Sequence, residues 1–226
     1  MKNSEGFCNT VIDTILASTV KMGFVPNLSS VVSFMPVWYH QLMVAEYSRK
    51  LALALEMRPA VARRLFVAGL FHDISKIFWN GNLHTKPYRF LSDDEKEKIR
   101  MHPKESVEIL INRAGKHKKA ITAGSPSIVD IIMYHHEKPD GSGYYNIKLD
   151  SKEIAILSIS DIFEACTENR PYRTKPMAGE EAAKVATKVY KSLFNDDEIV
   201  IIRRTLMEIL YNRNLYRGYF DAEFAV

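Results

Sequence analysis

Cysteine is nearly absent from this chain. Cys8 and Cys166 are its only cysteines among 226 residues, and they stand far apart in no spacing typical of a metal site. This argues against a disulfide-stapled scaffold and is typical of a reducing compartment. The sequence also lacks a run of eighteen apolar residues and a basic, apolar and cleavable leader at its N-terminus. We therefore expect no membrane span, no signal peptide and a cytoplasmic location.

Several common functional motifs are missing as well. The sequence has no internal repeat and no low-complexity segment, and few stretches alternate apolar and polar residues as strands do. It contains no P-loop, no G-x-S-x-G elbow and no dinucleotide-binding fingerprint. The net charge is +4, a mild excess that predicts no DNA partner but suits a small anionic substrate. These absences leave a helical enzyme or binding protein.

Helix signals are frequent instead, and they predict an all-α fold. Residues 37–56 carry apolar side chains at helical spacing, and Pro59 suits the first turn of a helix running to about Ser75. Ser92 and Glu95 form a capping box that opens a helix toward His102, which we expect Pro103 to break or restart. Further helix starts are expected at Ser125 with Pro126 (ending near His136), at Asp150 with Glu153, near Gly179 and near Asp196.

The same signals suggest one main domain. We expect a catalytic domain over residues 36–210 and a C-terminal tail, residues 211–226, packed on it. Residues 1–35 are either an N-terminal helical extension or the remnant of a regulatory region. Loop 137–150 contains Gly141 and Gly143, which permit close approach of the backbone to a ligand or a partner.

Histidines and aspartates recur at the ends of apolar helical segments. His72 and Asp73 end one such run, His135 and His136 end another, and Asp161 lies within a third. A carboxylate in apolar surroundings is costly unless a cation or hydrogen bonds compensate. Adjacent helical residues point about 100° apart, so His72 and Asp73 can serve neighbouring ions. The predicted ligand set is His40, His72, Asp73, His102, His135, His136 and Asp161.

Each of these residues has an ordinary explanation when taken alone. A single histidine such as His40 is more often a core or surface residue than a ligand, and Asp161 could cap or bond within its own helix. Only the combination favours a metal site. Imidazoles and carboxylates without thiolate suit iron, manganese or zinc. Two such ions about 3.5–4 Å apart activate water for phosphate-ester hydrolysis, with no nucleophilic side chain required.

Four motifs in this order resemble the HD-GYP branch of the HD-domain phosphohydrolases. FHDISK at residues 71–76 resembles the HDxGK motif, and LSDDEKEKIRMHP at 91–103 resembles LTxxE followed by HP. HHEKPDGSGYY at 135–145 resembles HHExxDGxGYP, and SDIFEACTENRPYR at 160–173 resembles the aspartate helix with its RPYR end. The resemblance extends from about residue 36 to residue 205.

This resemblance implies a helical bundle with a central binuclear metal site, most often iron or manganese. One metal would be held by His40, His72, Asp73 and Asp161, and the other by Asp73, His102, His135 and His136. The implied substrate is a cyclic dinucleotide, typically cyclic di-GMP, cleaved to linear pGpG or GMP. Lys76 would act near the scissile phosphate, Arg170 would grip a phosphate, and Gly143 and Tyr144 would line the substrate pocket.

The sequence departs from the family pattern at three places. Ser75 replaces the glycine before Lys76, which we expect to be a mild backbone change. Tyr145 replaces the signature proline, which brings recognition of a protein partner through loop 137–150 into question. Pro36 stands where a third-metal glutamate would be, so we expect two metals. The alternatives are a hydrolase of another cyclic dinucleotide or nucleotide, and a catalytically weak metal- and ligand-binding sensor or scaffold.

Overall fold

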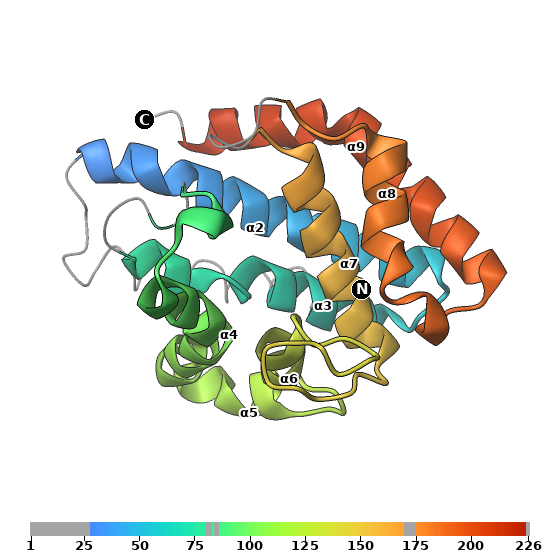
Figure 1. Ribbon diagram of the computed structural model, residues 1–226, viewed down its shortest axis with the longest axis horizontal. Coiled ribbons are helices and arrows are strands. Elements are labelled where there is room, and N and C mark those ends of the chain that lie inside the picture. Colours follow the sequence, from blue (N-terminus) through green and yellow to red (C-terminus); the bar gives the residue numbers. More distant parts are fainter. Residues whose placement is uncertain (1–27, 80–82, 84–85, 170–174, 225–226) are drawn as a thin grey trace.

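The protein is a bundle of helices in the computed structural model (Figure 1), which describes residues 28–79, 83, 86–169 and 175–224. Within those ranges there is no strand, so the all-α prediction is confirmed. The α-helices are α2 (Leu28–Ala54), α3 (Pro59–Phe71), α4 (Asp93–Arg113), α5 (Lys118–Thr122), α6 (Ile128–Tyr134), α7 (Lys152–Thr167), α8 (Gly179–Lys188) and α9 (Asp196–Phe224). Short 3₁₀ turns are η1 (Ile74–Phe78), η2 (Tyr88–Phe90), η3 (Gly115–His117) and η4 (Lys191–Leu193).

Helix α2 lies at the centre of the bundle. It contacts α3, α7 and α9, and Figure 1 shows it running between α3 and α9 with α7 crossing it. Helices α4 and α6 contact each other, and α6 also contacts α3 and α7. Fully buried apolar side chains from these helices form one core, which includes Met43, Leu51, Leu65, Ile131, Ile156, Phe163 and Ile202. The core therefore fixes the positions of the helices that carry the predicted ligands.

Helices α2 and α3 approach each other closely. A Cβ atom added to Gly69 would lie 2.5 Å from the Cα of Ala45 and 2.7 Å from its backbone nitrogen. Only glycine fits there, so its lower helix propensity is offset by backbone-to-backbone packing. This contact sets the spacing of α2 and α3, which carry His40 and His72.

Helix α4 corrects one expectation from the sequence. It runs without interruption from Asp93 to Arg113, with Pro103 inside it, so the predicted break at Pro103 is wrong. The capping box of Ser92 and Glu95, which is confirmed, satisfies amides at the start of this helix. Pro103 and its neighbours Ser106, Val107 and Leu110 are buried, so tertiary packing offsets the backbone bond that the proline removes.

Two other helix starts differ from prediction by one or two residues. The N-cap of α6 is Ser127, which forms a capping box with Asp130, so Ser125 and Pro126 precede the helix instead of opening it. The N-cap of α7 is Ser151, whose hydroxyl accepts from the amide of Ile154, instead of Asp150. A serine stands beside each predicted cap, which is why the pattern was misassigned. The predicted starts at Pro59, Gly179 and Asp196 are confirmed.

The predicted domain limits fall inside helices. Position 36 lies within α2 and position 211 within α9, so the chain continues as helix across both limits. The 1–35 extension is described only from residue 28, because residues 1–27 lie outside the described part of the chain. None of the helices described has the length and apolar character needed to cross a lipid bilayer.

We expect Gly69→Ala to destabilise the protein. The added methyl group would force α2 and α3 apart, and overpacking of this kind costs about 1–3 kcal/mol. For a chain of this size each kcal/mol lowers the melting temperature by about 2–4 °C, which calorimetry can measure. The control is Arg63→Ala, an exposed position on the same helix, which should melt within about 2 °C of the wild type. Equal melting of Gly69→Ala and wild type would contradict the close approach.

Candidate metal centre

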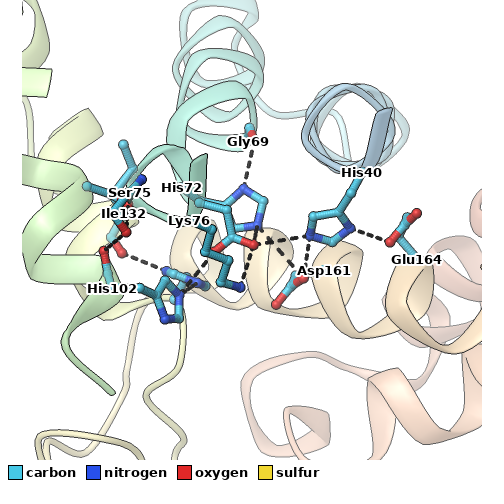
Figure 2. Close-up of polar contacts among 12 residues, drawn as sticks. His40, Gly69, His72, Ser75, Lys76, His102, Ile132, Asp161 and Glu164 are labelled. Carbon is cyan, nitrogen blue, oxygen red and sulfur yellow. Dashed lines mark hydrogen bonds and ion pairs between the residues drawn. The ribbon is translucent and has the colours of Figure 1, made fainter. Parts of the chain in front are cut away.

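The structure brings all seven predicted ligand residues together. His40 comes from α2, His72 is the C-cap of α3, and Asp73 follows as the N-cap of η1. The remaining four are His102 within α4, His135 and His136 at the end of α6, and Asp161 within α7. Figure 2 shows His40, His72, His102 and Asp161 directed toward one another from separate helices. Groups of these side chains have ligand atoms within 4.8 Å of one another.

Asp73 lies between two halves of this cluster. Its Oδ2 is 3.5 Å from Nε2 of His40 and 3.4 Å from Nε2 of His72. Its Oδ1 is 3.1 Å from Nε2 of His102. Asp161 completes the first half, with its Oδ1 at 3.2 Å from Nε2 of His40 and 3.8 Å from Nε2 of His72. One oxygen of Asp73 therefore faces each half, which is the geometry of a bridging carboxylate.

The second half consists of three imidazoles whose Nε2 atoms converge. Nε2 of His102 lies 3.4 Å from Nε2 of His135 and 3.2 Å from Nε2 of His136. Two nitrogens bound to one tetrahedral cation at about 2.1 Å lie about 3.4 Å apart. The spacing of these three rings therefore matches that of ligands sharing one ion.

Backbone carbonyls orient three of the rings. Nδ1 of His72 lies 2.8 Å from the carbonyl of Gly69, that of His102 2.5 Å from the carbonyl of Ile99, and that of His135 2.6 Å from the carbonyl of Ile132. A carbonyl can only accept, so each Nδ1 carries the proton. In the neutral ring the lone pair is then on Nε2, the atom that faces the cluster.

Burial and local charge set the protonation states. Burial, and then the rings of His72 and His102, lower the pKa of His135 to about 3. Burial and the ring of His135 hold the pKa of His136 well below its usual value, and burial also lowers the pKa of His102. Burial opposes the ionisation of Asp73, but Lys76 and the nearby imidazoles outweigh it and hold that pKa well below its usual range. At neutral pH the second half thus presents neutral nitrogens and an ionised carboxylate.

These states suit a cation. In the second half the neutral Nε2 atoms and the oxygen of Asp73 are all acceptors, so at 3.1–3.4 Å they would repel without a positive charge between them. Two buried atoms, Nε2 of His72 and Oδ1 of Asp73, have no hydrogen-bond partner among the described residues. Such atoms are costly to bury unless a bound ion satisfies them. The donor set therefore fits two divalent ions, one in each half.

Glu164, which is not in the predicted ligand set, contacts one of the histidines of that set. It lies one turn after Asp161 on α7, is 2% exposed, and accepts a hydrogen bond from Nδ1 of His40. Burial alone would lower the pKa of His40, but the carboxylates of Glu164, Asp161 and Asp73 raise it well above its usual value. A carboxylate behind a histidine is a frequent orienting partner in metal sites. The i, i+3 spacing of Asp161 and Glu164 was the available signal.

Lys76 and Ser75 hold the turn that follows the HD pair. Nζ of Lys76 is 2.6 Å from Oδ2 of Asp73, and the lysine side chain stays 23% exposed. The hydroxyl of Ser75 donates to the carbonyl of His102 at 3.1 Å, and its amide donates to Ser106 at 3.2 Å. A glycine could not make the first of these bonds. The replacement at 75 is thus a link between η1 and α4 as well as a backbone change.

Comparison with known families agrees with this architecture. The HD domain family model matches residues 12–197, most of the chain. The chain belongs to the HD domain family. It is 29% identical over 153 residues to the cyclic di-GMP phosphodiesterase PA4108 of Pseudomonas aeruginosa, which covers 66% of this chain and 34% of that protein. It is also 29% identical over 168 residues to the 3'3'-cGAMP-specific phosphodiesterase 1 of Vibrio cholerae, covering 72% and 35%. The chain thus spans about a third of these relatives.

Solved HD structures share the fold at low sequence identity. The HD domain of the phosphodiesterase PgpH from L. monocytogenes superposes with a TM-score of 0.56 at 22% identity, covering 84% of this chain and 99% of that one. Bd1817, an HDG"Y"P protein from Bdellovibrio bacteriovorus, gives 0.55 at 20% identity, covering 74% and 51%. The expected HD-domain helical bundle is therefore confirmed.

The signature loop of this HD domain covers the second half of the cluster. The ring of Tyr144 lies 4.4 Å from that of His136, tilted by 32°, and 6.1 Å edge-on from that of His102. A Cβ atom at Gly143 would lie 2.6 Å from the carboxylate of Glu137, so glycine is needed there for close packing. Arg170, the predicted phosphate-gripping residue, lies outside the described residues.

Glu137 anchors this loop by accepting hydrogen bonds from its backbone. Its side chain is fully buried and accepts from the amide of Tyr145 at 2.9 Å and from the amide of Ile147 at 2.8 Å. The hydroxyl of Tyr190 donates to its carbonyl at 3.3 Å. Proline, the usual residue of the signature at 145, has no N–H and could not make the first bond. Tyr145 therefore gives the loop an attachment that the family pattern lacks.

Metal analysis tests the cluster. We expect about two equivalents of divalent metal in protein purified without oxygen, and about one in His40→Ala and His102→Ala, which remove a ligand from one half each. The measurement is elemental analysis of the purified proteins by mass spectrometry. The control is His117→Ala, a histidine outside the cluster, which should keep wild-type content. Loss of both equivalents in His40→Ala and in His102→Ala would count against two distinct positions.

Substituting proline at position 145 should destabilise the loop. Tyr145→Pro removes the N–H that donates to Glu137, and hydrogen bonds to charged groups contribute about 1.5–3 kcal/mol. We expect a melting temperature several degrees lower and faster hydrogen exchange at the amide of Ile147. Tyr145→Phe keeps the N–H and the ring, so it should match the wild type in both measurements. A proline variant with wild-type exchange would show that the bond is unimportant.

Proposed function

We propose that this HD domain is a metal-dependent phosphodiesterase that hydrolyses a cyclic dinucleotide, with cyclic di-GMP as the first candidate. The observation that carries the proposal is the convergence of buried imidazole and carboxylate acceptors from five helices on two adjoining positions. The names of the relatives support the substrate class, since they act on cyclic di-GMP and on 3'3'-cGAMP. We further propose that the ions are iron or manganese, which suit histidine and carboxylate ligands.

A pair of bound divalent ions would supply water of lowered pKa and charge stabilisation at the scissile phosphate. Around it, the chain's own groups have separate tasks. Asp73 stays ionised and presents one oxygen to each half, so it fixes the spacing of the two positions. The carbonyls of Gly69, Ile99 and Ile132 hold His72, His102 and His135 with Nε2 inward.

Lys76 is the basic group best placed to meet the phosphate. Its ammonium lies 2.6 Å from Asp73 at the centre of the cluster, yet the side chain is partly exposed. It can therefore contact a phosphate oxygen next to the metals and offset the charge that builds up there. We propose that Arg170 assists by gripping a phosphate, since its planar fork suits paired hydrogen bonds.

Tyr144 is proposed to contact the substrate directly. Its ring covers His136, and burial raises the pKa of its hydroxyl, an effect to which Asp161 and Asp73 add. The hydroxyl therefore stays protonated and can donate to the substrate. Tyr88 and Arg100 also influence the pKa of this hydroxyl. Both are exposed, so the ring of Tyr88 could stack on a nucleobase and the guanidinium of Arg100 could bind a phosphate. Gly143 contributes by letting the loop sit close to Glu137.

Two further proposals concern the setting of the domain. Loop 137–150 is proposed as a contact for a protein partner, because Ile147 is 44% exposed and lysines 138 and 148 are near it in the chain. A cytoplasmic location is proposed from the low cysteine count, which suits a reducing compartment.

The decisive test is product formation. Metal-loaded protein should convert cyclic di-GMP to linear pGpG or GMP, and chromatography of the products measures the rate. The rate of His72→Ala should be at least about 100-fold lower, because this change removes a ligand. Lys76→Ala should lower kcat by about 10²–10³-fold while retaining its metal, because it removes a charge beside the phosphate. The matched control is Lys98→Ala, an exposed lysine on α4, which should turn over normally.

The outcome also separates the alternatives. Cleavage of 3'3'-cGAMP or cyclic di-AMP in preference to cyclic di-GMP would keep the reaction and change the substrate. Metal-loaded protein that binds the dinucleotide without releasing product under manganese or ferrous conditions would establish a sensor and refute the hydrolase.

A further inference from the structure

The three carbonyl-bound histidines share one local geometry. In each, Nδ1 bonds the carbonyl of the residue three positions earlier, which is Gly69 for His72, Ile99 for His102 and Ile132 for His135. In an uninterrupted α-helix such a carbonyl accepts from the amide four residues ahead of it. The carbonyl is therefore free to accept from Nδ1 of the histidine only when the amide four residues ahead does not bond it.

For two of the three the helix simply ends. Helix α3 stops at Phe71, before the amide of Asp73 that would have bonded Gly69. Helix α6 stops at Tyr134, before the amide of His136 that would have bonded Ile132. The last carbonyls of a helix have no intrahelical donor, and a side chain can satisfy them. Both histidines use this property of a helix C-terminus.

His102 is different because its helix continues. Helix α4 runs eleven residues beyond it, to Arg113. The residue four ahead of Ile99 is Pro103, which has no N–H. The carbonyl of Ile99 is thus left without a backbone donor in the middle of a helix, and Nδ1 of His102 lies 2.5 Å from it.

We infer that Pro103 is a positioning residue for His102: by withholding its amide it frees the carbonyl of Ile99, which then fixes the imidazole with Nε2 toward the cluster. The cost is a weaker helix, because an interior proline removes a hydrogen bond and crowds the preceding turn. The benefit is a ring held in one tautomer beside Asp73 and His136, from a helix that does not have to end there. This inference rests on the proposed metal-dependent function.

Pro103→Ala separates the two effects. Alanine restores the amide, which competes with the ring for the carbonyl, while it also removes a helix-breaking residue. We expect the metal-free variant to melt at a higher temperature than the wild type and to bind manganese about 10–100-fold more weakly, as when an orienting partner is lost. Calorimetry in chelator measures the first quantity and isothermal titration with manganese the second.

The control and a second readout keep the test decisive. Pro59 is exposed in the first turn of α3, where an amide has no carbonyl of the helix to bond. Pro59→Ala should therefore leave manganese affinity unchanged. In ¹⁵N-labelled protein, the Nδ1–H of His102 should give a slowly exchanging resonance that weakens or disappears in Pro103→Ala but persists in Pro59→Ala. This readout needs no metal, so it tests the role of Pro103 even if the wild type binds none. Absence of metal binding by the wild type would refute the proposed function and not the role of Pro103. An unchanged resonance and affinity in Pro103→Ala would overturn the inference.

Discussion

The structure depends on one electrostatic constraint, which is that carboxylates and imidazoles are packed against one another inside the core. Five contacts of 3.1–3.8 Å join an oxygen of Asp73 or Asp161 to Nε2 of His40, His72 or His102, and each of these side chains is largely buried. Because burial removes most of the screening by water, these carboxylates need positive charge beside them, which Lys76 and His40 supply in part and the proposed ions would complete. The helix packing delivers these groups, and the chemistry proposed for them follows from the same need.

The backbone does much of the orienting that side chains do in other sites. Three imidazoles are fixed by carbonyls from their own helices, whereas His40 is fixed by a distant carboxylate, that of Glu164 on α7. A carbonyl within the same turn moves with its histidine, so the ring orientation is set as soon as the helix forms. His40, in contrast, depends on the contact between α2 and α7. The first half of the cluster is therefore the more sensitive to helix packing.

The sequence predicted the elements and the cluster members well, because both leave local signals. The capping box at Ser92, the proline at 59 and the motif pairs at 72–73 and 135–136 are read directly from the chain. Glu164 is not in the predicted set because its importance arises from His40 on α2, 124 residues away. The break expected at Pro103 failed because buried neighbours on α4 offset the local penalty of the proline. Tertiary contacts of this kind are invisible to helix propensity.

The cluster residues come from segments far apart in the sequence, and this has a consequence for how fast the protein is degraded in the cell. The members of the cluster come from α2, α3, α4, α6 and α7, so a cation bound there would staple together segments that are distant in sequence. Binding energy at such a site adds to folding energy, since the unfolded chain offers no comparable cage. Starvation for that ion would then expose the chain to proteases, and abundance would follow mineral supply even where the gene is transcribed at a constant rate.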